Sequence, residues 1–231
     1  MAAESGQSTA PEDNATKEGI SPWLETGLVF GGLVLCQTAD DEINDWLQRR
    51  RNDKLESFAD IVRPFGGPAV YVPVGAGLYL TGLISGNTEA RQAAERICLS
   101  LTIAGLSSGS LKYLAGRSRP SSGAPSDRFR PFCRLTSFPS GHTTMAFTLA
   151  GSISREIDNR WATAGLHLLA GSVGLSRLID ELHWLSDIVA GALLSRYVTS
   201  LVYDHVLPGE DSGVTACWTV AGPTLAWCAG F

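Results

Sequence analysis

The sequence predicts an all-α helical bundle of about six helices, which we expect to be transmembrane. Two observations point to this class. Charged residues make up 18% of the chain, below the roughly 25% of soluble globular domains. Apolar residues make up 44% and lie in long runs, and the 25 glycines suit helices that pack closely in lipid. A length of 231 residues is enough for one domain with a sizeable core.

Six apolar runs follow one another along the chain, and we expect each to form a helix. They cover about 21–39, 66–88, 96–114, 141–155, 161–176 and 184–203. The second is the clearest, because Pro64 to Thr88 holds no charged residue and is long enough to span a hydrocarbon core of roughly 30 Å. The uncharged parts of the first and third runs, Thr26 to Ala39 and Ile97 to Leu111, are shorter and also suit buried helices of a soluble protein.

The segments around these runs divide the chain into three parts. Residues 1–19 are polar and acidic, and we expect a disordered arm because they bury too little apolar surface to fold. The helical domain is expected over residues 20–207. Within it, residues 40–60 alternate charged and apolar side chains, which predicts a surface or interfacial helix or an amphipathic connector. Residues 208–231 form a C-terminal tail, in which 214–231 suits a short strand pair or an irregular segment.

Charge and cysteine content narrow the function classes. The formal net charge of −5 offers no general attraction for nucleic acid, so no nucleic-acid partner is expected. Five arginines nevertheless crowd into one short stretch: Arg117, Arg119, Arg128, Arg130 and Arg134. The five cysteines follow no zinc or redox spacing, so no metal site is expected. The stretch from Met1 to Gly19 lacks the features of a cleaved signal peptide, so any export would depend on uncleaved apolar segments.

A carboxylate follows a histidine by four residues in the segment from His183 to Asp187. If both residues lie on one helix, they share a face. A carboxylate that accepts a hydrogen bond from the imidazole Nδ1 fixes the tautomer, leaves Nε2 free to attack and stabilises a cationic ring. The pair therefore suits an activated nucleophile, although an isolated pair of this kind is more often structural.

Three basic residues provide the positive charge that phosphoryl transfer needs around the equatorial oxygens: Lys112, Arg119 and Arg177. Lys112 ends an uncharged run, where an unpaired ammonium is costly unless it meets an anion or water; the alternative is a lysine that snorkels at a helix end. Arg119 precedes Pro120, which predicts an extended segment that folds back over the same pocket. Arg117 is a competitor for this role.

The sequence Pro139-Ser140-Gly141-His142 combines a helix start with a histidine. Ser140 is expected to cap a helix over Thr143–Ser154, and Gly141 leaves the backbone exposed, so that free N–H groups and the helix dipole form an anion site. The simpler interpretation is an N-cap alone. His142 would lie beside a bound phosphate and protonate the leaving oxygen, and two histidines with separate duties would let an enzyme work without metal.

Other polar candidates near these blocks have simpler interpretations. Asp180 and Glu181 are expected to be solvated loop carboxylates, and His167 a core or interfacial histidine. Trp184 is expected either to line the pocket or to anchor a helix at a membrane interface.

Together the three blocks resemble the signature of the type 2 phosphatidic acid phosphatase (PAP2) superfamily, KxxxxxxRP, PSGH and SRxxxxxHxxxD. Every fixed position is filled and every internal spacing is kept between Lys112 and Asp187. The resemblance implies a helical bundle in which the blocks meet at one end, and a pocket that opens on the outer side of the membrane. It implies no cofactor and a set of catalytic and phosphate-binding residues. The catalytic residues would be His183, His142 and Asp187, and the phosphate-binding residues Lys112, Arg119, Ser140, Gly141 and Arg177.

The expected protein is thus a metal-independent phosphoric ester hydrolase that cleaves phosphate monoesters or pyrophosphates of lipids through a phosphohistidine on His183. Its partners would be a phosphorylated lipid, or another phosphate ester, and the bilayer. Three alternatives stay open: a soluble periplasmic acid phosphatase of broad specificity, a vanadium-dependent haloperoxidase, and a membrane protein that keeps a phosphate pocket without catalysis. The chain is short for a haloperoxidase, and no catalytic position of the signature is lost.

The resemblance places the protein in the inner (cell) membrane with its site facing the periplasm or the outside. If all six helices span, the segments 40–65, 112–140 and 177–183 share one side and hold all three blocks. About twelve of the 18 lysines and arginines lie on this same side. The positive-inside rule therefore argues against the side that the resemblance implies. We give more weight to the resemblance.

Overall fold

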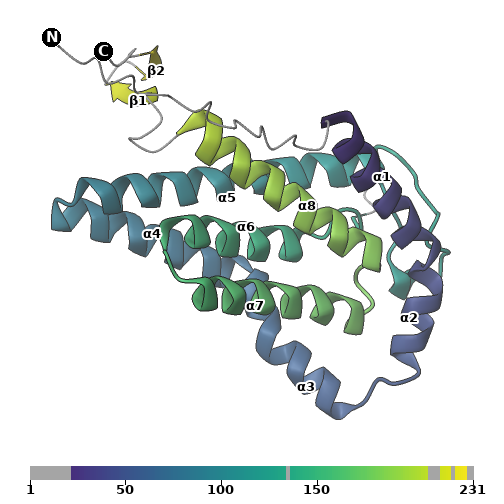
Figure 1. Ribbon diagram of the computed structural model, residues 1–231. Helices are drawn as coiled ribbons and strands as arrows, with labels where there is room; N and C mark the ends of the chain where they lie inside the picture. Colours follow the sequence, from purple (N-terminus) through teal and green to yellow (C-terminus); the bar gives the residue numbers. More distant parts are fainter. Residues whose placement is uncertain (1–21, 134–135, 208–213, 220–221, 228–231) are drawn as a thin grey trace, which may run out of the picture.

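The computed structural model describes residues 22–133, 136–207, 214–219 and 222–227 (Figure 1). The eight α-helices of this part of the chain confirm the predicted all-α bundle. They are α1 (Pro22–Thr38), α2 (Asp40–Gln48), α3 (Asp53–Val62), α4 (Pro68–Ser85), α5 (Thr88–Ala115), α6 (Gly141–Glu156), α7 (Arg160–Ile179) and α8 (Leu185–Leu201). The remaining elements are the 3-10 turns η1 (Arg63–Gly66) and η2 (Pro120–Ser122), the π-helical turn η3 (Val202–Val206), and an antiparallel hairpin of β1 (Val214–Thr219) and β2 (Gly222–Trp227). The expected disordered arm, residues 1–19, lies outside the described residues.

Helix α6 is at the centre of the bundle, where it packs against α5, α7 and α8. Figure 1 shows α4 and α5 as one hairpin and α6 and α7 as a second, with α8 lying across α5 and α6. The buried face of α6 carries small side chains such as Thr144, Thr148 and Ala150. The two threonine hydroxyls donate to carbonyl oxygens one turn earlier, at O···O distances of 2.9 and 2.8 Å. Since these hydroxyls are satisfied within the helix, three neighbours can approach α6 closely.

Two helix boundaries differ from the prediction. Helix α5 begins at Thr88 rather than at residue 96, because Asn87 caps it and accepts a backbone N–H of the first turn at 3.1 Å. The first two turns of α5 contain charged residues, so a prediction based on the apolar run does not include them. The helix predicted within residues 40–60 is two helices, because the chain breaks before Asn52, whose side chain caps α3.

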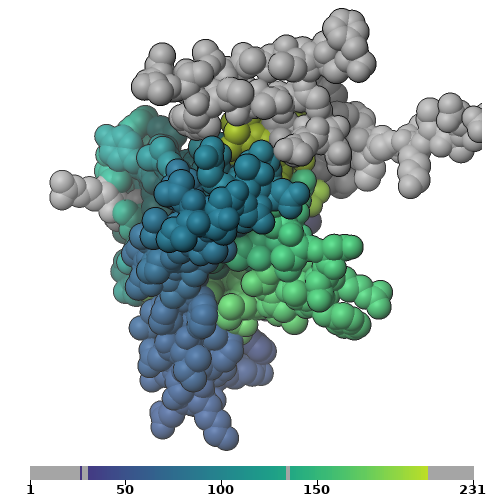
Figure 2. Space-filling model, turned by 90° about the vertical axis from the view of Figure 1, so that its left-hand side faces the viewer, coloured from purple at the N-terminus to yellow at the C-terminus, as the bar shows by residue number. Residues whose placement is uncertain are grey.

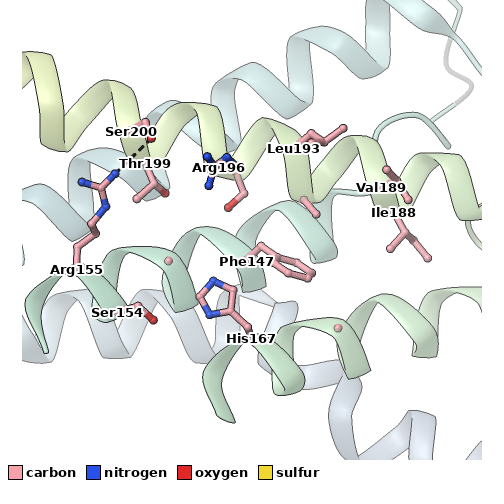
Figure 3. A pocket seen from close by; sticks show the side chains of 14 residues that line it. Phe147, Ser154, Arg155, His167, Ile188, Val189, Leu193, Arg196, Thr199 and Ser200 are labelled. Carbon is pink, nitrogen blue, oxygen red and sulfur yellow. Dashed lines mark hydrogen bonds between the residues drawn. The ribbon is translucent and has the colours of Figure 1, made fainter. Parts of the chain in front are cut away.

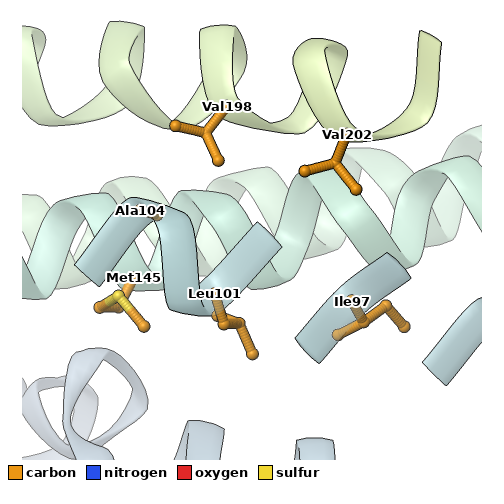
Figure 4. Packing of buried hydrophobic residues seen from close by; sticks show 6 residues of the cluster. All are labelled: Ile97, Leu101, Ala104, Met145, Val198 and Val202. Carbon is orange, nitrogen blue, oxygen red and sulfur yellow. The ribbon is translucent and has the colours of Figure 1, made fainter. Parts of the chain in front are cut away.

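A hydrophobic cluster holds α5, α6 and α8 together at the middle of the bundle (Figure 4). Its buried members come from α5, α6, α8 and η3: Ile97, Leu101, Ala104, Met145, Val198 and Val202. Ala104 and Val202 are fully buried. In lipid the contacts of such a cluster stabilise helix association by shape and dispersion rather than by exclusion of water. The cluster therefore sets the spacing of the three helices that carry the polar blocks.

Four helical stretches of the described residues are long and apolar enough to cross a membrane. They are Asp53–Ser85, Thr88–Ala115, Arg160–Ile179 and Leu185–Val206. The outer face of α4 exposes large apolar side chains, among them Leu80, Leu83 and Ile84, and the last is 83% exposed. Lipid is the natural environment of such a face. The chain is a membrane protein.

The two ends of the bundle differ in character. The turns between α4 and α5 and between α6 and α7 lie at one end, which Figure 2 views directly with the first turn in blue and the second in green. The last turns of α5 and α7 and the first turns of α4, α6 and α8 lie at the other end, together with α2. This second end gathers all three polar blocks.

Candidate active site

Each predicted site residue lies where an element begins or ends at this second end of the bundle. Lys112 is in the last turn of α5, and Arg177 is in the last turn of α7. Ser140 caps α6, and Gly141 and His142 open that helix. The segment after α7 carries His183, and the first turn of α8 carries Asp187. The remaining residue, Arg119, precedes η2 in an extended conformation, as predicted.

A sharp reversal after α5 returns the chain to the site. Gly116 ends α5 with a positive φ of 56°, and a Cβ there would lie 1.8 Å from the carbonyl oxygen of Arg130. Backbone hydrogen bonds then join the two sides of the reversal, from Arg130 N to Gly116 O at 2.8 Å and from Ser118 N to Arg128 O at 3.1 Å. Only glycine combines this φ with this close approach. The reversal positions Arg119 over the end of α5.

The ammonium of Lys112 binds the segment of chain that leads into α6. Its Nζ donates to the carbonyl oxygen of Thr136 at 2.8 Å and also to that of Pro139. The start of α6 is further fixed by Ser140, whose backbone N–H donates to the carbonyl oxygen of Asp187 at 3.0 Å. Ser140 also caps α6 as predicted. The phosphate-binding candidates of α5 and α6 are therefore held beside the first turn of α8.

The histidine and carboxylate of the third block meet, although not on one helix. His183 precedes α8, which begins at Leu185, so the expectation that the pair shares a helix face was wrong. The pair forms because Asp187, in the first turn, reaches back to cap α8: its Oδ2 accepts the Trp184 N–H at 2.9 Å and lies 3.5 Å from His183 Nδ1. His183 is 4% exposed. At 3.5 Å the contact is longer than an ordinary hydrogen bond, and such contacts tighten when substrate binds.

A buried network behind Asp187 escaped the sequence analysis. Arg117 is 1% exposed and donates to Asp187 Oδ1 at 2.6 Å and to Asp40 Oδ2 at 2.7 Å. Ser137 donates to Asp187 Oδ2 at 2.5 Å, and Ser186 donates to Asp40 Oδ2 at 2.5 Å. Arg117 therefore does not compete with Arg119 for the pocket, because two carboxylates hold it inside the protein. Asp40 opens an ordinary charged stretch, so nothing local in the sequence marked it.

Asp180 is clamped between two arginines rather than solvated, which corrects the prediction. Arg63 Nε donates to its Oδ2 at 3.1 Å, and Arg177 donates to the same carboxylate. Glu181 lies 3.6 Å from Arg51 near the surface. Trp184 is buried and its indole N–H donates to the Ser118 carbonyl oxygen at 2.9 Å, so it packs against the reversal instead of anchoring a membrane interface.

Unsatisfied polar atoms mark the space between these residues. Among the described residues, the buried Nε atoms of Arg119 and Arg177 have no hydrogen-bond partner. Buried polar atoms are nearly always paired, so these two unpaired donors indicate room for a polar ligand. The described residues contain no group of three or more histidine, cysteine, aspartate or glutamate side chains that could hold a metal ion.

The pocket is electrically positive. Burial, followed in order by the nearby charges of Arg177, His183, Lys112 and Arg63, lowers the pKa of His142 to about 4. Burial is also the largest reason that the pKa of His183 is lowered; Asp187 opposes this shift, while Lys112 contributes to it. Both imidazoles are therefore neutral at pH 7 when no anion is bound.

The fold and the site define a membrane helical bundle with a cationic pocket at one end. The family model of the PAP2 superfamily matches residues 94–207, which include every signature position. This part of the chain, which holds the whole candidate site, is similar to the PAP2 superfamily.

Two curated relatives are similar over part of the chain. The lipid A 1-phosphatase of Porphyromonas gingivalis is 34% identical over 94 residues, which cover 40% of this chain and 19% of that protein. The probable lipid phosphate phosphatase 4 of Arabidopsis thaliana is 30% identical over 146 residues, which cover 48% of this chain and 47% of that protein. The chain thus spans less than half the length of these curated relatives.

Two crystal structures share the fold over most of their length. LpxE of Aquifex aeolicus has a TM-score of 0.58 at 22% identity, covering 72% of this chain and 95% of that one. A transmembrane PAP2 type phosphatidylglycerolphosphate phosphatase from Bacillus subtilis has a TM-score of 0.60 at 19% identity, covering 79% and 96%. The arrangement of helices in this chain is therefore similar to that in these two structures.

Binding of a tetrahedral dianion should be coupled to proton uptake by His142. The neutral imidazole is surrounded by cations. A bound dianion offsets their charge, so the pKa of His142 rises and the ring takes up a proton at pH 6. Titration calorimetry with tungstate in buffers of different ionisation enthalpy measures this uptake. His142→Gln should lose most of it, whereas His205→Gln, an exposed residue after α8, should keep it. Equal uptake in His142→Gln and the unchanged protein would contradict the prediction.

Proposed function

We propose that this protein is a metal-independent phosphatase that hydrolyses phosphate monoesters or pyrophosphates of lipids through a phosphohistidine on His183. One observation carries the proposal: three positively charged side chains, the capped start of α6 and a buried histidine–aspartate pair converge at one end of a membrane bundle. The names of the curated relatives agree with this reaction class. Its expected partners are a phosphorylated lipid and the bilayer.

In the first step, Nε2 of His183 attacks phosphorus. The lone pair of Nε2 forms the N–P bond while the bond from phosphorus to the leaving oxygen breaks. Asp187, oriented by Arg117 and Ser137, faces Nδ1 and stabilises the positive charge that the ring gains. The lowered pKa of His183 supports this role, because the ring is neutral and its lone pair available at pH 7.

His142 is the group that we propose protonates the leaving oxygen. A bound phosphate offsets the surrounding cations, so the ring becomes an acid only after substrate arrives. In the second step water attacks phosphorus, the N–P bond breaks, inorganic phosphate leaves, and His142 accepts the proton of that water. His183 returns to its neutral form, and the balance of the two steps needs no metal ion.

The remaining site residues stabilise the charge on the transferred phosphoryl group. The unpaired Nε atoms of Arg119 and Arg177 provide donors for the equatorial oxygens. Lys112 adds positive charge, and the Gly141 N–H adds a donor at the start of α6, which the Ser140 cap holds in place. These assignments rest on placement in the pocket and on the electrostatic environment described above.

An apolar groove between α4 and α5 supports a lipid substrate. A cavity of about 230 Å³ holds Lys112 and His142 at one end and Tyr71 and Gly105 at the other. Tyr71 and Gly105 also line a second cavity of about 380 Å³ that follows α5 as far as Cys98. The shared residues make one path from the pocket into the apolar part of the bundle, where an acyl chain fits. A soluble ester would have no use for this path.

We further propose that the site faces the periplasm or the outside of the inner (cell) membrane. The resemblance of the three blocks to the PAP2 signature supports this side. The distribution of lysine and arginine supports the opposite one, since the end that holds the site also holds most of them. A separate experiment therefore tests the orientation of the protein in the membrane.

The nucleophile assignment predicts a specific pair of defects. His183→Ala should reduce phosphate release from phosphatidic acid by about 10⁴-fold or more, because no group remains to form the covalent intermediate. His142→Ala should lower kcat by about 10²–10⁴-fold while tungstate still binds, because proton transfer alone is lost. His205→Ala is the control. Full activity in His183→Ala would defeat the mechanism, and loss of activity in EDTA that Mg²⁺ restores would defeat its metal independence.

If the groove holds an acyl chain, a larger side chain at Gly105 should impair hydrolysis of a long-chain lipid but not of a small soluble ester. A Cβ at Gly105 meets only the Met145 sulfur, at 3.8 Å, so Gly105→Leu fills the groove without a steric clash in the backbone. It should raise KM for long-chain phosphatidic acid about tenfold or more and leave hydrolysis of p-nitrophenyl phosphate unchanged. Gly77→Leu adds the same side chain to α4 at an open position outside the groove and should change neither. Parallel effects of Gly105→Leu on both substrates would contradict the groove.

Cys133 is suited to report the orientation. Its exposed thiol lies in the segment between α5 and α6, at the end that holds the site. In a variant whose other cysteines are replaced by serine, a membrane-impermeant maleimide should label Cys133 in intact spheroplasts. Labelling only after the membrane is opened would place the site on the cytoplasmic face.

A further inference from the structure

A second groove lies on the opposite side of α6 from the acyl path (Figure 3). Its volume is about 600 Å³, and its walls are α6, α7 and α8. Figure 3 shows Arg155 and Ser200 toward one end and Ile188 and Val189 toward the other, with Arg196 on the side of Arg155. One end is thus cationic and hydroxylic, and the other is apolar.

The cationic end is far from the catalytic pocket. Arg155 lies fourteen residues after Gly141 in α6, which is about 21 Å along the helix axis. Its guanidinium donates to Asp204 at 2.8 Å and to Ser200 at 3.3 Å. This end is therefore near the turn between α6 and α7, at the other face of the membrane from the site.

Arg196 gives the groove its chemical character. It is exposed and lies near the middle of the candidate span Leu185–Val206, and no ion pair is found for it among the described residues. An arginine inside a span is costly unless it meets an anion, water or a polar group, and it commonly marks a functional site. Thr199, Ser200 and the Arg155–Asp204 pair lie at the same end of the groove, so an anion there would find hydroxyl donors as well.

The rest of the groove suits a hydrocarbon chain. Phe147, Ile188 and Leu193 line it, and two glycines, Gly151 and Gly171, give it depth. A Cβ at Gly171 would meet nothing within 4 Å, so the space beside α7 is open. An apolar channel of this size with one cationic end is complementary to an amphipathic anion.

We propose that this groove binds an anionic phospholipid of the leaflet opposite the active site. Its phosphate contacts Arg196 and Arg155, and an acyl chain lies along α8 toward Ile188. A second copy of the chain is a poorer match for Arg196. The carboxylates of Asp204 and Glu95, which lie at this end of the bundle, already pair with Arg155 and Arg91. The site is separate from the proposed hydrolysis, because the phosphate is held at the other face.

The proposal is tested by native mass spectrometry of the purified full chain with phosphatidylglycerol or phosphatidylcholine. Phosphatidylglycerol is a phosphodiester and offers no terminal phosphate to the active site. We expect it to bind in preference to phosphatidylcholine, and Arg196→Gln to weaken its binding about fivefold, the effect of one cation near an anionic lipid. Arg160→Gln removes an exposed arginine at the same end of the bundle, outside the groove, and should have no such effect.

A second pair of variants tests the channel itself. Gly171→Leu fills it and should weaken phosphatidylglycerol binding, whereas Gly165→Leu, an equally open position of α7 outside the groove, should not. Equal thermal denaturation midpoints establish that the variants fold. The proposal is overturned if Arg196→Gln and Gly171→Leu both bind phosphatidylglycerol like the unchanged chain, or if phosphatidylcholine binds equally well. A dimer that Arg196→Gln dissociates would assign the groove to a second copy instead.

Discussion

The structure of the site depends on one buried carboxylate. Asp187 accepts hydrogen bonds from Arg117, from Ser137 and from the backbone of Trp184, and it faces the ring of His183. These partners come from three places in the chain that the helices bring to one end of the bundle. A buried carboxylate without such partners would be strongly destabilising. The requirement to satisfy Asp187 therefore fixes the reversal after α5, the segment before α6 and the start of α8 relative to one another.

The membrane imposes a second constraint on the same residues. Polar side chains are costly within the spans, so the polar blocks lie at helix ends, where chain reversals and caps can satisfy them. The central helix α6 combines polar residues with close packing. Its first turn is polar, and its buried hydroxyl groups donate to carbonyl oxygens of the preceding turn. The pocket is thus formed at a helix start that three neighbours hold in place.

The sequence was sufficient to predict the class of fold, the six long helices and the extended Arg119, because apolar runs and proline act locally. It was also sufficient to propose residues that the fold brings together. It missed the start of α5, where charged turns are held by the cap at Asn87. It missed Asp40, whose importance comes from Arg117, far along the chain. It also treated Asp180 as solvated, because the partner Arg63 lies in a distant turn. The last two misses involve tertiary contacts that no local pattern encodes, whereas the start of α5 depends on a local cap that the apolar run did not include.

The net charge of the buried network influences how easily the ring of His183 becomes positively charged. Asp40, Arg117 and Asp187 together carry one net negative charge in a space closed to water. Before an anion binds, burial and the cations on the other side of His183 outweigh this charge and keep the ring neutral. A phosphate that neutralises those cations leaves the negative cluster acting on the ring with less opposition. Arrival of the anion therefore makes a positive charge on His183 easier to form at the moment when the attack on phosphorus creates it.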